Sequence, residues 1–262
     1  MLLIPDNYDV HGCSHPDINV SHFLWPSATT YTQNLVNLLG ATSITIYREC
    51  CHNTGIARPS IISGLVPGCM LGIPGSFPLD LMHLAVLNLP DLLLSLWCGT
   101  IACDSNDDKT TWDWATLIGD AREMHGKQVA TARQFLPGSF DHPPQNITEK
   151  LNSGYKAWEF LTYLYGLGPR LLYPLLHLPY WQNYCQLVSV IQQLHQKCLA
   201  TNSLQQVHSD LTGFYHDFEL LYCQRKVKQL HFVHPCVHLL VHAVPEVEHM
   251  GPLPCYSQWT ME

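Results

Sequence analysis

Apolar positions follow two different patterns in this chain, and the pattern changes near residue 77. In residues 1–76, prolines and glycines interrupt nearly every apolar run, which predicts loops. The exception is the stretch 30–39, where Tyr31, Leu35 and Leu38 recur at helical spacing ahead of Gly40. We therefore expect an irregular, loop-rich N-terminal segment with one short helix.

The Leu-rich stretch 79–97 is the first strongly helical pattern and is nearly long enough to span a bilayer. It carries polar and helix-breaking residues throughout, namely Asp80, His83, Asn88, Pro90 and Asp91. Because a charged side chain in the middle of a membrane helix costs about 3 kcal/mol, the stretch predicts a buried core helix and no membrane span.

Three further helices are predicted before residue 200. The first has Trp114, Leu117, Ile118 and Ala121 on one side. The second opens at Asn146, which forms a capping box with Glu149, and its apolar stripe comprises Tyr155, Trp158, Leu161, Leu164 and Tyr165. The third has a face of Tyr184, Leu187, Val188, Ile191, Leu194 and Cys198.

A long helix is predicted after Ser203, which caps it together with Gln206. Its apolar residues alternate three and four apart and form a seam for packing against another helix: Leu204, Val207, Leu211, Phe214, Phe218 and Leu221. We therefore expect a mainly α protein, with a loop-rich segment 1–76, a helical segment 77–145 and an all-helical domain 146–262.

Composition narrows the class of protein. The 262 residues include 13 Lys and Arg against 21 Asp and Glu, a net charge of −8, which argues against autonomous binding to DNA. With 47% hydrophobic and 13% charged residues, the chain is not disordered. The first residues lack a basic start, so we expect an intracellular, non-secreted protein whose eleven cysteines are mostly reduced and buried.

Two acids on the stretch 79–97 invite a metal-site interpretation. Asp80 and Asp91 share a helix face, with His83 beside the first, but eleven residues rise about 16 Å, whereas paired metal ions lie about 4 Å apart. An unbroken helix cannot bring both acids to one centre. Asp80 either donates one ligand to a site completed elsewhere or is a first-turn acid favoured by the helix dipole.

Histidines and cysteines form two other candidate metal sites. Zinc ligands are available from His11, Cys13 and His15 together with Cys50, Cys51 and His52, although ordinary polar loop residues explain the same pattern. His234, His238 and His242 are spaced four apart beside His231, which predicts either a transition-metal site with Glu246 or a half-buried helix with satisfied histidines.

Several strings, in this order, resemble the CACTA (En/Spm-like) transposon proteins of basidiomycete fungi over nearly the whole chain. They are residues 5–13 (PDNYDVHGC), 54–61 (TGIARPSI), 77–84 (FPLDLMHL), 136–141 (LPGSFD), 153–159 (SGYKAWE) and 257–262 (SQWTME). In that family a ribonuclease-H-like transposase core is followed by a helical, His-containing domain. The resemblance implies a nuclear protein of a family that cleaves and transfers DNA strands with acids holding two Mg²⁺ or Mn²⁺ ions.

The resemblance carries over site roles at two positions only, Asp80 and His83, which match the family's Asp-[Ile/Leu]-Met-His motif. Plant relatives place a Glu where Ala85 stands here, and the family carries most of its core upstream. We therefore expect a transposon-derived fragment without independent catalysis. The alternatives are a helical protein–protein interaction module, which pairs with a partner or with itself through the seam 204–221, and an active metal-dependent nuclease.

Overall fold

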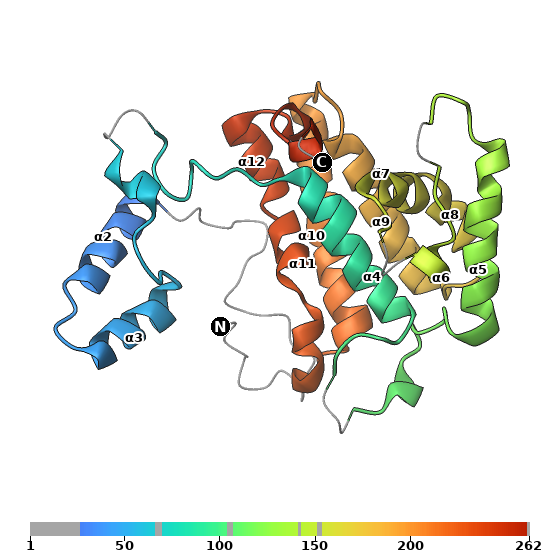
Figure 1. The fold of residues 1–262 in the computed structure, drawn as a ribbon, viewed down its shortest axis with the longest axis horizontal. Coiled ribbons are helices and arrows are strands. Elements are labelled where there is room, and N and C mark those ends of the chain that lie inside the picture. Colours follow the sequence, from blue (N-terminus) through green and yellow to red (C-terminus); the bar gives the residue numbers. More distant parts are fainter. Residues whose placement is uncertain (1–26, 66–69, 104–106, 141–142, 151–153, 261–262) are drawn as a thin grey trace. The chain divides into compact units, whose positions relative to one another are not determined.

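The computed structural model describes residues 27–65, 70–103, 107–140, 143–150 and 154–260 (Figure 1). These residues form helices and loops and contain no strand, which confirms the predicted mainly α class. The chain divides into two compact units. The smaller comprises His22–Pro78, and the larger comprises Leu79–Glu262 together with residues 1–21, which lie outside the described ranges.

The smaller unit contains two α-helices that contact each other, α2 (Ala28–Leu39) and α3 (Ile44–Thr54), followed by a 3₁₀ turn, η1 (Ile61–Gly64). Ser27 and Ser43 cap the two helices with their hydroxyl oxygens. The predicted helix 30–39 is confirmed as α2. The sequence pattern missed α3, none of whose residues is buried; its less exposed face consists of Tyr47, Cys50, Cys51 and Thr54, which form only a weak apolar pattern.

The predicted buried helix is confirmed in the larger unit. Residues 81–97 form one continuous helical run, which is π-helical in η2 (His83–Asn88) and α-helical in α4 (Leu89–Trp97). The wider π turn precedes Pro90, whose missing N–H interrupts the regular hydrogen-bond ladder. The Tyr165 hydroxyl donates to the Ala85 carbonyl within the π turn. No helix in the described ranges is long and apolar enough to cross a membrane.

Two long helices, α9 (Leu178–Leu194) and α10 (Thr201–Phe218), lie side by side in Figure 1 and pack against each other. The Asn183 side chain donates to the Phe214 carbonyl at 3.1 Å, and Gln186 donates to the Asp210 carbonyl at 2.9 Å. Most of the predicted seam is buried inside this chain: Leu204, Val207, Leu211, Phe214 and Phe218. The seam is therefore not free to pair with another chain.

Apart from α5, the other described elements of the larger unit are short. The α-helices are α5 (Gly119–Thr131), α6 (Ile147–Lys150), α7 (Ala157–Phe160), α8 (Gly168–Leu171), α11 (Pro235–Leu240) and α12 (Ala243–Met250). Two more segments are π-helical, η5 (Leu161–Leu167) and η6 (Glu219–Cys223). The 3₁₀ turns are η3 (Lys109–Thr111), η4 (Ala132–Phe135), η7 (Val227–Phe232), η8 (Leu253–Cys255) and η9 (Gln258–Thr260).

Two predicted helix starts are wrong, and a third predicted helix is interrupted. Trp114 lies in a loop before α5, where it stacks on Trp112 at 5.4 Å, so its apolar spacing reflects a buried loop. The helix predicted from Asn146 does begin there, since α6 starts at Ile147 and the Asn146 side chain accepts from the Thr148 N–H at 3.0 Å, but it is split into α6 and α7, with Gly154 at a φ of 104° between them. The long helix α10 begins at Thr201 without a side-chain cap, so Ser203 and its predicted box lie inside the helix.

One core joins residues 79–145 to the remainder of the larger unit. The buried Trp97 indole donates to the Tyr222 hydroxyl at 3.0 Å and meets the Tyr184 ring edge-on at 5.2 Å. The nine cysteines in the described ranges are all free thiols, but only Cys223 and Cys236 among them are buried, so the expectation of mostly buried cysteines is wrong. The two segments that the sequence pattern separates at residue 145 therefore fold around the same aromatic side chains.

A matched pair of glycines tests this packing. At Gly168, an added Cβ meets the buried Tyr184 hydroxyl, which donates to the Leu164 carbonyl, whereas at Gly166 a Cβ meets nothing within 4 Å. We expect Gly168→Ala to lower the free energy of unfolding by about 2 kcal/mol. Gly166→Ala should leave it unchanged or raise it by up to about 1 kcal/mol. Urea denaturation measures both, and equal effects would contradict the packing described.

Candidate functional site

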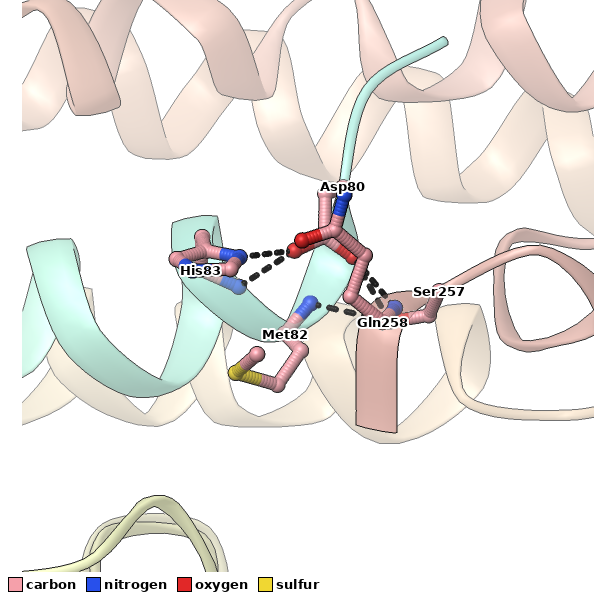
Figure 2. Close-up of polar contacts among 5 residues, drawn as sticks. All are labelled: Asp80, Met82, His83, Ser257 and Gln258. Atoms are coloured by element: carbon pink, nitrogen blue, oxygen red, sulfur yellow. Dashed lines mark hydrogen bonds and ion pairs between the residues drawn. The ribbon is translucent and has the colours of Figure 1, made fainter. Parts of the chain in front are cut away.

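The Asp-Leu-Met-His motif lies at the start of the central helix (Figure 2). Asp80 occupies the N-cap position, and its Oδ2 accepts a hydrogen bond from the His83 backbone N–H at 3.1 Å. The same oxygen is in contact with His83 Nδ1, which lies on the first turn. Because the carboxylate oxygen only accepts, Nδ1 carries the proton. Asp80 and His83 are thus brought together, as their spacing predicts.

The second Asp80 oxygen holds a distant part of the chain. Oδ1 accepts from the Ser257 hydroxyl at 2.9 Å and from the Gln258 backbone N–H at 2.9 Å. The Ser257 oxygen in turn accepts from the Met82 backbone N–H at 3.2 Å. Figure 2 shows the five residues around one carboxylate. We call this arrangement of Asp80, Met82, His83, Ser257 and Gln258 the Asp80 clasp.

The electrostatics of the clasp favour an ionised Asp80. Partial burial by itself raises the pKa of the carboxyl group, because it disfavours the charged form. Hydrogen bonds from the Gln258 N–H, the His83 side chain and backbone, and the Ser257 hydroxyl outweigh this effect and hold the pKa of Asp80 below its ordinary value. The carboxylate is therefore charged at neutral pH and binds four donors.

The other acid of the predicted pair lies apart from the clasp. Asp91 is exposed in the first turn of α4. In the described ranges, no three His, Cys, Asp or Glu side chains are grouped so that they would hold a metal ion. Assignment of Asp80 and His83 as catalytic residues stays a prediction. In this geometry, Asp80 caps the helical run 81–97 and holds the C-terminal segment against the start of that helix.

The two histidine and cysteine candidates have different outcomes. His238 and His242 approach each other, with 3.2 Å between their Nε2 atoms, although α11 ends at Leu240 between them. Burial lowers the pKa of both rings, and His238 lowers that of His242 further. His234 is the N-cap residue of α11. The imidazole rings of His238 and His242 are therefore partly buried and mainly neutral.

The predicted zinc ligands divide between α3 and the undescribed N-terminal residues. Cys50, Cys51 and His52 lie in the second half of α3. His11, Cys13 and His15 fall outside the described ranges, so the four-ligand zinc site stays a prediction.

Ser257 and Gln258 are the clasp residues that lie outside the Asp-Leu-Met-His motif, and the sequence alone predicted no role for them. They lie 177 and 178 positions from Asp80, and no local pattern links a serine near the C-terminus to a carboxylate so far away. The only signal was indirect, since both residues belong to strings that carry the family resemblance.

Comparison of the chain with known proteins finds no matching family model, no similar curated protein and no similar solved structure.

We expect Asp80→Ala to lower the free energy of unfolding at pH 7 by about 2–4 kcal/mol, because it removes a helix cap and an acceptor of charge-assisted hydrogen bonds. The pKa of folded Asp80 lies below the unfolded value of about 3.9. Its stabilisation is therefore complete above that value and is lost as the pH falls through the folded pKa. Urea titrations from pH 7 downward should show the gap between wild type and variant narrowing below about pH 4.

Asp91→Ala is the control, because Asp91 is exposed on the same helical run; we expect it to cost no more than about 0.5 kcal/mol. Ser257→Ala completes a double-mutant cycle with Asp80→Ala. The clasp predicts that the two effects are not additive, so additivity within about 0.3 kcal/mol would contradict it.

Proposed function

We propose that this chain is a helical domain derived from a CACTA-type transposase. It has no catalytic activity of its own and serves as a helical scaffold within a larger assembly. The observation that carries the proposal is the occupation of both Asp80 oxygens by donors from the same chain. Asp80 is the acid that matches the family motif, and here it acts as a structural residue.

Metal-dependent strand cleavage sets a specific demand on such a carboxylate. Its lone pairs must point at divalent ions that lie about 4 Å from each other and clamp the attacking and leaving oxygens. The Asp80 oxygens instead accept from the His83 and Gln258 backbone N–H groups and from the Ser257 hydroxyl. Redirecting them to Mg²⁺ or Mn²⁺ removes the helix cap and releases the C-terminal segment. Metal binding for DNA strand cleavage and the observed fold therefore require the same two carboxylate oxygens of Asp80.

The charge of the chain supports a binding role within a larger assembly. A net charge of −8 repels the phosphates of free DNA. In this proposal, DNA in the nucleus is bound by an intact transposase of the parent family. This chain contributes a helical scaffold with a preformed core.

A plasmid-nicking assay tests the proposal. Supercoiled DNA incubated with the full chain and either Mg²⁺ or Mn²⁺ should stay supercoiled, with the same background for wild type and Asp80→Asn. Nicking by the wild type that disappears in a folded Asp80→Asn protein would instead establish the metal-dependent nuclease. Circular dichroism confirms that both proteins are folded.

The interaction module is a second candidate, and the smaller unit contains the observation that favours it. Leu39 ends α2 and is 61% exposed, while Ile44 begins α3 and is 64% exposed, so two large apolar side chains flank the loop between these helices. A second copy of this chain offers the same apolar loop, and a two-fold contact buries both. We propose this loop, in place of the buried seam 204–221, as the surface for self-association.

Light scattering during size-exclusion chromatography tests this second candidate. The wild type should elute as a dimer, and the double variant Leu39→Asp, Ile44→Asp as a folded monomer, because charges in an apolar contact are desolvated without partners. Leu239→Asp, on an exposed position of the larger unit, is the control and should stay dimeric. A monomeric wild type would refute self-association.

A further inference from the structure

Four histidines lie close together in the sequence around α11, and the structure gives them different surroundings. His231 Nε2 lies 2.8 Å from the Ala102 carbonyl oxygen, and His234 is the N-cap residue of α11. His238 lies in the last turn of α11 and His242 is the N-cap residue of α12, and the side chains of these two residues approach each other. We call His238 and His242 the histidine pair.

The Nε2 atoms of the histidine pair have the separation of two ligands of one metal ion. They lie 3.2 Å apart, whereas the ring centroids are 5.0 Å apart, so the Nε2 corners of the two rings face each other. A histidine nitrogen binds Zn²⁺ at about 2.0–2.1 Å. At that distance from one ion, nitrogens 3.2 Å apart subtend an angle of about 100–106°, close to the tetrahedral value of about 109°.

Backbone hydrogen bonds fix the spacing of the pair although α11 ends between its members. The His238 carbonyl accepts from the Val241 N–H at 3.2 Å, and the Leu239 carbonyl accepts from the His242 N–H at 3.1 Å. The His242 carbonyl then accepts from the Glu246 N–H at 3.0 Å in the first turn of α12. The chain thus keeps a helical turn between the two histidines, which places side chains four residues apart on one face.

The protonation of the pair suits a metal ion, because histidine binds metals as neutral imidazole. Burial lowers the pKa of both rings, so protons do not block both nitrogens at pH 7. Without a metal ion, one Nε2 donates its proton to the other. Metal binding moves that proton to Nδ1 of the same ring, which leaves a lone pair on each Nε2. Both residues are partly exposed, so their rings have room to turn these lone pairs toward an ion.

We propose that His238 and His242 together bind one divalent transition-metal ion of the class that prefers imidazole, such as Zn²⁺, through their Nε2 atoms. In the described ranges no third His, Cys, Asp or Glu side chain completes the site, so water occupies the other coordination positions. The ion links the end of α11 to the start of α12. The site shares no residue with the Asp80 clasp and stands independently of the proposed transposase origin.

Long-range ¹H–¹⁵N NMR spectra of the imidazole rings test the proposal during a titration of the full chain with Zn²⁺ at pH 7. Before zinc is added, one ring of the pair should carry its proton on Nε2. At saturation both rings should carry it on Nδ1, and both Nε2 signals should shift with one common midpoint. Spectra of His238→Gln and His242→Gln assign the two rings.

Each of these single variants should also raise the zinc concentration at the midpoint of the remaining ring by at least about tenfold. This expectation is conservative, because even the loss of a group that only orients a histidine ligand weakens metal binding about 10–100-fold. His216→Gln is the matched control, since His216 is exposed on α10, and it should leave the midpoint of the pair unchanged.

Equilibrium dialysis separates this site from other zinc ligands such as Cys50 and Cys51. The double variant His238→Gln, His242→Gln should bind one zinc ion fewer per chain than the wild type. A ring of the pair that does not respond to zinc, different midpoints for the two rings, or an unchanged midpoint in a folded single variant would each overturn the proposal. Because the change of tautomer is read in the wild type, the test does not depend on the folding of a variant.

Discussion

The fold of the larger unit depends on the burial of the helical run 81–97. Nearly all of its apolar side chains are shielded from water, so neighbouring elements must cover it and every polar group of its backbone must find a partner inside the protein. Asp80 and Ser257 supply acceptors for the N–H groups of the first turn, and the Tyr165 hydroxyl bonds the Ala85 carbonyl at the π turn. The hydrogen bonds that satisfy the backbone of this helix therefore connect it to Tyr165 in the middle of the chain and to Ser257 in the C-terminal segment.

This constraint gives the Asp-Leu-Met-His motif a physical meaning that does not require catalysis. A carboxylate at the start of an apolar helix stabilises the N–H groups that no carbonyl can reach, and a low pKa follows from the same hydrogen bonds. A lowered carboxylate pKa is also common in catalytic sites, so the shift alone does not identify function. The partners that lower the pKa of Asp80 are the His83 side chain and backbone, the Ser257 hydroxyl and the Gln258 N–H of the same chain.

The pocket near His195 follows from a different feature, the interruption of regular helices. Three π-helical segments occur among the described residues of the larger unit, and η5 is the one that lines a pocket of about 880 Å³ together with residues 136–140 and the C-terminal end of α9. A π turn inserts one additional residue per turn and displaces the following side chains, so a helix containing it cannot pack as closely along its whole length. Gly166 adds to the gap because it has no side chain, and the exposed rings of Phe140 and Trp158 border it.

Local patterns predicted the helical class, the buried run 81–97 and the apolar faces of α9 and α10, because apolar periodicity and buried area are properties of a single segment. They failed at Trp114, whose spacing mimics a helix but arises from a loop that stacks in the core, and at α3, whose covered face is only half-buried. The partners of each surface were decided only by the tertiary structure: α9 covers the seam of α10, and Ser257 reaches Asp80 across 177 residues. Such contacts depend on how distant segments meet in space, which no local spacing encodes.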